Sequence, residues 1–135
     1  MRLAMSRSCA LMAMVAAAAA VAGCGGEPAA VDVSGSTLRV KLDEYRIQPQ
    51  NVRMKAGRIH LVATNDGRLT HNVVIESITD DPTKQVVYGR TDTAHPGQTV
   101  KERDPISLKP GRYRIADSIG NHENLGQYGT LTLVK

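Results

Sequence analysis

The chain of 135 residues contains no tryptophan, no phenylalanine and only four tyrosines. A hydrophobic core must therefore be built from valine, isoleucine and leucine, with a few tyrosines. So few aromatic rings provide no platform for stacking nucleic-acid bases, which argues against single-stranded nucleic acid as a partner. The formal net charge is +4, but basic and acidic residues are interspersed and no basic run occurs, so the charge does not predict nucleic-acid binding either.

Cysteine is nearly as scarce, because the chain has only Cys9 and Cys24. Two arginines precede an alanine-rich apolar run over residues 9–21, which is too short to form a stable membrane-spanning helix. The run leads into the sequence Val-Ala-Gly before Cys24, which resembles the lipobox of bacterial lipoproteins. We therefore expect residues 1–23 to be a lipoprotein signal peptide and Cys24 to carry the lipid. An ordinary signal peptide followed by a chance cysteine is the alternative.

Lipidation at Cys24 would leave the mature chain without a thiol, which excludes disulfides, thiolate metal ligands and cysteine nucleophiles. It would also hold the protein on the outer face of a bacterial cell membrane, because several acyl chains together anchor a protein stably. Residues 24–36 are rich in glycine, proline, alanine and serine and are predicted to be a flexible tether. Residues 37–135 then form one domain of about a hundred residues.

The domain contains short β-type segments and no apolar repeat with a helical period. Leu38, Val40 and Leu42 alternate with polar residues, which is typical of a half-buried strand. Turn residues separate this segment from further expected strands over residues 59–64, 71–75, 85–90, 98–102, 111–116 and 128–134. Seven or eight short strands at this spacing predict an all-β fold, a two-sheet Greek-key β-sandwich. A short helix could occupy residues 76–84.

Two blocks of the domain resemble the cupredoxins, the fold family of plastocyanin and azurin. The first block runs from Ile47-Gln48-Pro49 to Thr70-His71-Asn72-Val73-Val74-Ile75, and the second from Leu108-Lys109-Pro110-Gly111 to Gly129-Thr130-Leu131. The resemblance covers nearly all of residues 37–135 and implies a cupredoxin-like β-sandwich. It also implies a copper site, which in this family is held by two histidines, a cysteine and a weak axial methionine.

The resemblance places this site at four positions of the chain. His71 matches the first histidine ligand and His122 the second, whereas Asp117 stands where the family has cysteine and Gln127 where it has methionine. The spacing Asp117-x4-His122-x4-Gln127 lies within the family's range of loop lengths. Asn72 matches the residue whose side chain pins the ligand loop by hydrogen bonds from behind the ligands.

Replacing the cysteine thiolate by a carboxylate changes the expected chemistry. The thiolate gives blue copper its covalency, whereas a carboxylate is a harder ligand that favours Cu(II) over Cu(I). We therefore expect a type-2-like Cu(II) site, with Zn(II) as the second candidate. Such a site would serve copper holding or delivery, or slow electron transfer, with a membrane-bound redox or copper-handling protein as partner.

A metal-free protein is the alternative that the residues leave open. Asp117 and His122 would then form an ion pair that closes the loop, and loop carbonyls would satisfy His71. The domain would serve as a scaffold or interaction module of a membrane assembly. Two further histidines are expected to be peripheral, His60 in a strand opposite its apolar neighbours and His95 before a Pro-Gly turn. No nucleophile elbow and no His-Glu-x-x-His pattern occurs, so we expect no enzyme.

Overall fold

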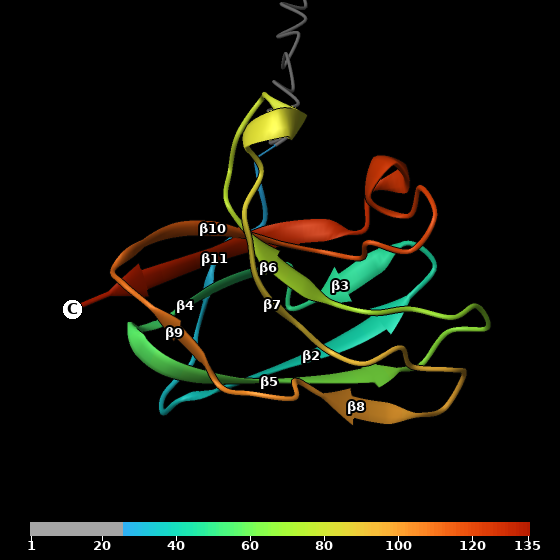
Figure 1. Cartoon of the computed structure of the whole chain (residues 1–135). Coiled ribbons are helices and arrows are strands. Elements are labelled where there is room, and N and C mark those ends of the chain that lie inside the picture. Colours follow the sequence, from blue (N-terminus) through green and yellow to red (C-terminus); the bar gives the residue numbers. More distant parts are fainter. Residues whose placement is uncertain (1–25) are drawn as a thin grey trace, which may run out of the picture.

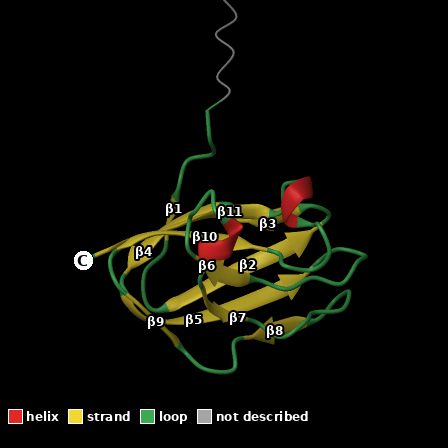
Figure 2. Ribbon diagram, turned by 45° about the horizontal axis from the view of Figure 1, so that its top comes forward, coloured by secondary structure: helices red, strands yellow, loops and turns green. Residues whose placement is uncertain are grey.

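Two β-sheets pack face to face in the computed structural model, which describes residues 26–135 (Figure 1, Figure 2). One sheet has the strand order β1-β4-β11-β10-β6-β7, and the other has the order β3-β2-β5-β8, with β9 also paired to β5. The strands are β1 (Val31–Asp32), β2 (Thr37–Asp43), β3 (Arg46–Gln48), β4 (Asn51–Lys55), β5 (Gly57–Asn65), β6 (Val74–Glu76), β7 (Val87–Arg90), β8 (Thr99–Lys101), β9 (Ile106–Leu108), β10 (Gly111–Ala116) and β11 (Tyr128–Val134). Both sheets are mixed, because β2 pairs with β5 and β4 with β11 in parallel. The expected β-sandwich is confirmed.

A strand lies at each of the seven positions expected from the sequence, although the one expected over residues 71–75 is β6 and begins only at Val74. Four more strands accompany these seven. The additional strands are β1, β3, β4 and β9. In β4, Val52 and Met54 are buried and alternate with Asn51, Arg53 and Lys55, so the strand signal was present in the sequence but was overlooked. The strands β3 and β9 have only three residues each, which is too short to show a period of two.

The strand β1 lies inside the segment that we expected to be a flexible tether, residues 24–36. Val31 and Asp32 pair in parallel with β4, and the amide of Val33 donates to the carbonyl of Arg53 at 2.8 Å. The ordered sheet therefore begins before residue 37. The sequence did not show this, because both side chains of β1 are exposed and the pairing uses only backbone groups. The predicted signal peptide and Cys24 lie outside the described residues.

Helical structure in the described residues is confined to two 3-10 turns, η1 (Pro82–Lys84) and η2 (Glu123–Leu125). The short helix considered over residues 76–84 is the single turn η1, which begins where the side chain of Asp81 accepts a hydrogen bond from the amide of Thr83. Within residues 26–135, no helix has the length and apolar character needed to cross a membrane.

The core between the sheets is aliphatic, as the lack of large aromatic residues requires. Its buried members are Leu38, Val40, Leu42, Ile47, Val52, Met54, Ile59, Leu61, Ala63, Val73, Ile75, Ile106, Leu108, Ile115, Leu131 and Leu133. Tyrosines contribute less to the core than predicted. Tyr113 packs only at the edge of this cluster, and Tyr88 and Tyr128 are exposed.

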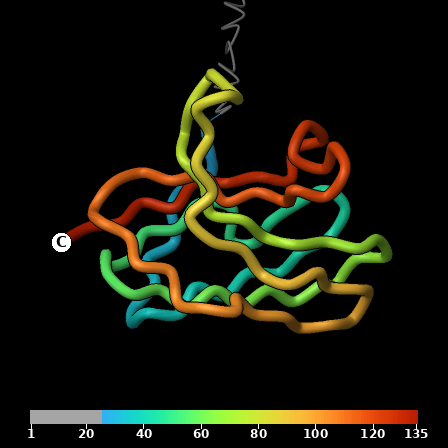
Figure 3. Tube along the Cα trace, in the orientation of Figure 1, coloured from blue at the N-terminus to red at the C-terminus, as the bar shows by residue number. Residues whose placement is uncertain are grey.

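Three connecting segments meet at one end of the sandwich, on the right in Figure 3. They are the turn between β2 and β3, the loop that follows β5, and the loop between β10 and β11. Because strands of both sheets hold these segments, side chains distant in the sequence are brought together on a rigid base.

Candidate metal centre

Each of three predicted ligands is positioned by a different piece of backbone. His71 lies in the loop after β5, where it exchanges two backbone hydrogen bonds with Ala94, of 3.0 and 2.8 Å. Asp117 directly follows β10, and its amide donates to the carbonyl of Gln127 at 3.0 Å. His122 precedes η2 and is held by its own amide, which donates to the carbonyl of Ile119 at 3.2 Å.

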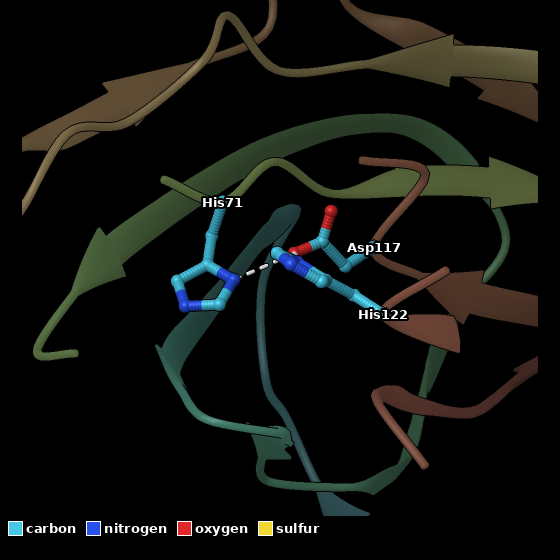
Figure 4. A group of neighbouring side chains, drawn as sticks. All are labelled: His71, Asp117 and His122. Carbon is cyan, nitrogen blue, oxygen red and sulfur yellow. Dashed lines mark hydrogen bonds and ion pairs between the residues drawn. The ribbon is translucent and has the colours of Figure 1, made fainter. Parts of the chain in front are cut away.

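These three side chains point toward one another (Figure 4). Asp117 Oδ2 lies 2.7 Å from His71 Nδ1 and 2.9 Å from His122 Nδ1. The side chains of His71 and Asp117 are fully buried, whereas that of His122 is 13% exposed. His122 is therefore the member of the group that reaches the surface. The structure thus brings together three of the four residues predicted as ligands.

The other oxygen of Asp117 is also held in place. Asp117 Oδ1 accepts from the amide of Ile119 at 2.9 Å and, more weakly, from the amide of Asn72 at 3.4 Å. The Asn72 side chain donates from Nδ2 to Ser118 Oγ at 3.0 Å and accepts from the amide of Ser118 at 2.9 Å. These bonds join the backbone beside His71 to the backbone beside Asp117. The effect of Asn72 on metal binding stays a prediction.

Gln127, the fourth predicted ligand, is fully buried. Its Nε2 donates to the carbonyls of Asp43 at 3.0 Å and of Arg46 at 3.3 Å, so the amide connects the loop just before β11 to the turn between β2 and β3. Two carbonyl acceptors fix which end of the amide is the nitrogen. The oxygen Oε1 is buried and has no hydrogen-bond partner in the described part of the chain. The axial role of Gln127 stays a prediction.

Glu44 is a member of the site that the sequence did not predict. Its Oε1 lies 3.1 Å from His71 Nε2 and accepts from the amides of Arg68 and Leu69, each at 2.7 Å. The hydrogen bonds from Leu69 and from His71 lower the pKa of Glu44 to about 2. No sequence motif marks this residue, because the contact spans 27 positions and depends on how the turn after β2 meets the loop after β5.

His71 therefore faces a carboxylate at each ring nitrogen. A neutral imidazole carries one N–H, so both contacts are hydrogen bonds only when the ring is protonated at both nitrogens. This differs from the metal-free arrangement considered from the sequence, in which loop carbonyls satisfy His71. The other part of that alternative, a contact between Asp117 and His122, is present at 2.9 Å and is an ion pair when His122 is protonated.

The residues fit a metal ion in donor type, convergence and burial. Two imidazole nitrogens and one carboxylate oxygen form a donor set that copper and zinc both accept. The present separations of 2.7 and 2.9 Å are those of hydrogen bonds. A bound ion would take the place of the protons between Asp117 and the two histidines, which makes metal binding compete with protonation.

The remaining histidines are not members of this group. His60 is 47% exposed in its side chain and lies 2.9 Å from Glu102 Oε1. Burial alone would raise the pKa of Glu102, but the hydrogen bonds from the Leu61 amide and from His60 outweigh it, and the net shift is downward. The His95 ring is exposed, and within residues 26–135 its one polar contact is between Nδ1 and Thr70 Oγ1, at 3.4 Å. Both are peripheral, as expected.

No family model and no curated protein sequence matches the chain. Solved structures do resemble it. Auracyanin from Roseiflexus castenholzii, reduced with dithionite, is 17% identical with a TM-score of 0.62, over 76% of this chain and 100% of that one. Auracyanin A, a blue copper protein from Chloroflexus aurantiacus, is 14% identical with a TM-score of 0.61, over 77% and 100%. Reduced rusticyanin is 16% identical with a TM-score of 0.56, over 78% and 84%. At these identities the likeness establishes the fold, and the chain has a cupredoxin-like β-sandwich.

Proposed function

We propose that this protein binds one copper ion, as Cu(II), through His71, Asp117 and His122. The observation that carries the proposal is the convergence of their three donor atoms within 4.8 Å of one another at one end of a cupredoxin-like sandwich. Two of the three side chains are fully buried, so the group is built into the fold and is not a chance meeting of surface residues.

The donor set decides which chemistry the ion would supply. The chain has no cysteine after Cys24, so residues 26–135 offer no thiolate and a blue copper centre is not expected. Two imidazoles and a carboxylate favour Cu(II) in a type-2-like site, with Zn(II) as the second candidate. The unpaired Oε1 of Gln127 is the atom that we propose as a weak axial ligand.

The role proposed for the site is copper holding or delivery at the cell surface, or slow electron transfer. The lipobox-like sequence before Cys24 supports attachment to the outer face of a bacterial membrane, with a membrane-bound redox or copper-handling protein as partner. Such a partner would meet the site at His122, because this ring is the part of the group that reaches solvent.

Electron paramagnetic resonance of the purified protein during titration with Cu(II) tests the proposal. In a non-coordinating buffer, we expect one saturable axial signal with coupling to nitrogen. His71→Ala should abolish this stoichiometric signal, because it removes a buried ligand. His95→Ala is the matched control and should keep the signal, since His95 is exposed and is not among the three converging side chains. Circular dichroism of each variant verifies the fold.

The proposal fails if wild-type protein gives only the spectrum of free or nonspecifically bound copper. It also fails if His71→Ala, still folded, takes up copper as the wild type does. Asp117→Asn is a second test variant. It keeps the shape of the side chain and one oxygen at the site but removes the negative charge. We expect this variant to bind Cu(II) more weakly than the wild type.

A metal-free scaffold is the second candidate, and one observation favours it. Without any ion, Asp117 Oδ2 lies within hydrogen-bond distance of Nδ1 of both histidines, and Glu44 Oε1 lies within that distance of His71 Nε2. When the rings carry the protons that these contacts need, Asp117, Glu44 and the histidine nitrogens facing them are paired without a metal. For a metal-free scaffold, the titration above should give no stoichiometric copper signal, and the protein should act by binding a protein partner.

A further inference from the structure

Three nitrogen atoms lie within hydrogen-bond distance of a single carboxylate oxygen of Glu44. Oε1 accepts from the amides of Arg68 and Leu69 at 2.7 Å and lies 3.1 Å from His71 Nε2. The side chain is 27% exposed, whereas the imidazole that it faces is fully buried. Glu44 therefore reaches inward from the turn after β2 and closes the outer side of the His71 ring.

The loop after β5 is shaped to receive this carboxylate. A Cβ atom at Gly67 would collide with Glu44 Oε1 and would lie 3.1 Å from Asp43 Cα, so a residue without a side chain is needed there. Asn65 holds the loop in position. It accepts from the Gly67 amide at 2.9 Å and donates to the carbonyls of Leu69 at 2.7 Å and Ala94 at 2.8 Å.

The position of Glu44 determines which nitrogen of His71 is available to a metal. A proton on Nε2 that is donated to Glu44 leaves Nδ1 as the nitrogen with a free lone pair. Nδ1 is also the atom that faces Asp117, at 2.7 Å. His122 has no comparable support, because its Nε2 makes no hydrogen bond within the described residues and its ring instead lies 5.2 Å from that of Tyr45.

We propose that Glu44 is a positioning residue of the metal site, which holds the Nε2–H of His71 and thereby presents Nδ1 to the ion. The inference rests on the proposed function. A carboxylate behind a ligating histidine fixes the orientation of the ring and raises its basicity. A more basic imidazole is a stronger donor to Cu(II), so Glu44 also strengthens the preference of the site for the oxidised ion.

A purely structural role for Glu44 makes different predictions. In such a role, Glu44 would only connect the turn after β2 to the loop after β5, through its hydrogen bonds with the amides of Arg68 and Leu69. In that case Glu44→Gln, which keeps an acceptor oxygen, should behave as the wild type in every respect. The positioning role instead predicts a change in the His71 ring itself, seen in a measurement that the hydrogen bonds to Arg68 and Leu69 do not affect.

The test compares copper affinity and the His71 ring in three variants. Glu44→Ala should weaken Cu(II) binding by roughly 10- to 100-fold, as for other groups hydrogen-bonded to ligating histidines. Glu44→Gln should weaken it less, because it loses only the charge. The matched control is Glu102→Gln, which alters the other glutamate that pairs with a histidine and a backbone amide and should leave copper affinity unchanged.

Pulsed paramagnetic resonance of the copper-loaded protein gives the specific signature. It detects the remote nitrogen of each ligating imidazole, and the quadrupole coupling of that nitrogen depends on the hydrogen bond made by its proton. We expect Glu44→Gln to shift the signal of one imidazole and leave the other unchanged, because only His71 contacts Glu44. Unchanged affinity and an unchanged remote-nitrogen signal in both Glu44 variants would overturn the inference.

A second measurement separates failure of this inference from failure of the proposed function. In the metal-free protein, nuclear magnetic resonance should show a slowly exchanging Nε2 proton on His71, which is lost in Glu44→Ala. Gly67→Ala should perturb the same proton without removing the carboxylate, because the added methyl group displaces Glu44. If wild-type protein binds no copper, the proposed function fails, and this proton alone decides whether Glu44 orients the ring. Its persistence in both variants would refute the role of Glu44.

Discussion

Asp117 has the largest influence on the chemistry of the site. Its Oδ2 bridges the two histidines, and its Oδ1 accepts from the amide of Ile119 and, more weakly, from that of Asn72. The resemblance to cupredoxins identified this position, together with His71, His122 and Gln127, because local sequence patterns surround each of them. Glu44 could not be found in the same way, since nothing in its neighbourhood shows that it meets a loop 27 residues away.

Asp117→Cys tests whether residue 117 occupies the position of the cysteine ligand. With copper, the variant should gain an intense visible absorption, because a thiolate would join the two imidazoles. Absorption spectroscopy of the copper-loaded variant measures this. The variant loses the hydrogen bond from the Ile119 amide, and we expect a stability loss of about 1–3 kcal/mol. Asp117→Ser is the control of similar size without a thiol. A folded, copper-loaded Asp117→Cys protein that remains colourless would contradict the assignment.

At the scale of the elements, strands with clear alternation were predictable and those defined by their neighbours were not. In β2, the alternating apolar residues are buried as predicted, with Leu38 and Leu42 fully inaccessible. In β1, exposed side chains carry no signal, and the strand exists because β4 offers free backbone groups. The turn between β2 and β3 belongs to the same class. Its role in the site follows from packing at the end of the sandwich, which the order of residues does not reveal.

Glu76 in β6 is a buried carboxyl group close to β10 and η2, and its ionisation should make the stability of the protein depend on pH. Its Oε1 has no hydrogen-bond partner within residues 26–135, and its neighbours in charge are Glu123 of η2 and Arg114 of β10. Burial, with a further contribution from Glu123, raises the pKa of Glu76, and Arg114 opposes the rise. Since the pKa is higher in the folded than in the unfolded state, stability falls as pH increases from about 4 through the folded-state value.

Glu76→Gln should therefore raise the melting temperature at pH 7, where the wild type carries the full cost of a buried charge. The gain should shrink as the pH is lowered toward 4, because the wild-type carboxyl group then becomes neutral as well. Calorimetry over this range measures both effects. Asp104→Asn, at an exposed position, is the control. A gain that does not depend on pH would show that packing, and not ionisation, causes it.

At the scale of the whole molecule, the fold class follows from composition and turn spacing. The stability of the metal-free protein depends on its aliphatic core. The site sits at the end of this core, and its ligands come from segments that unfolding would separate. Copper binding and folding are therefore thermodynamically linked under the proposed function. The sequence predicts the ligands and the framework separately, but only the packed structure shows that the site joins both sheets.

Thermal unfolding with and without Cu(II) measures this linkage. At a free copper concentration of a hundred times the dissociation constant, the folded state should gain about 2.7 kcal/mol. For a domain of this size, the melting temperature should rise by about 10 °C. Adding a chelator should reverse the rise. An equal rise in His71→Ala, or none in the wild type, would be inconsistent with a site built from the predicted ligands.

The bond from Asn51 Nδ2 to the carbonyl of Pro28, of 2.6 Å, limits how far the domain could travel. Under the proposed attachment, Cys24 lies only four residues before Pro28, and a chain of this length spans at most about 14 Å. The domain would then be confined to a thin layer above the lipid. It would search for its partner in two dimensions, by diffusing sideways with its anchor, and a soluble acceptor would have to come to the membrane to exchange an ion or an electron with it.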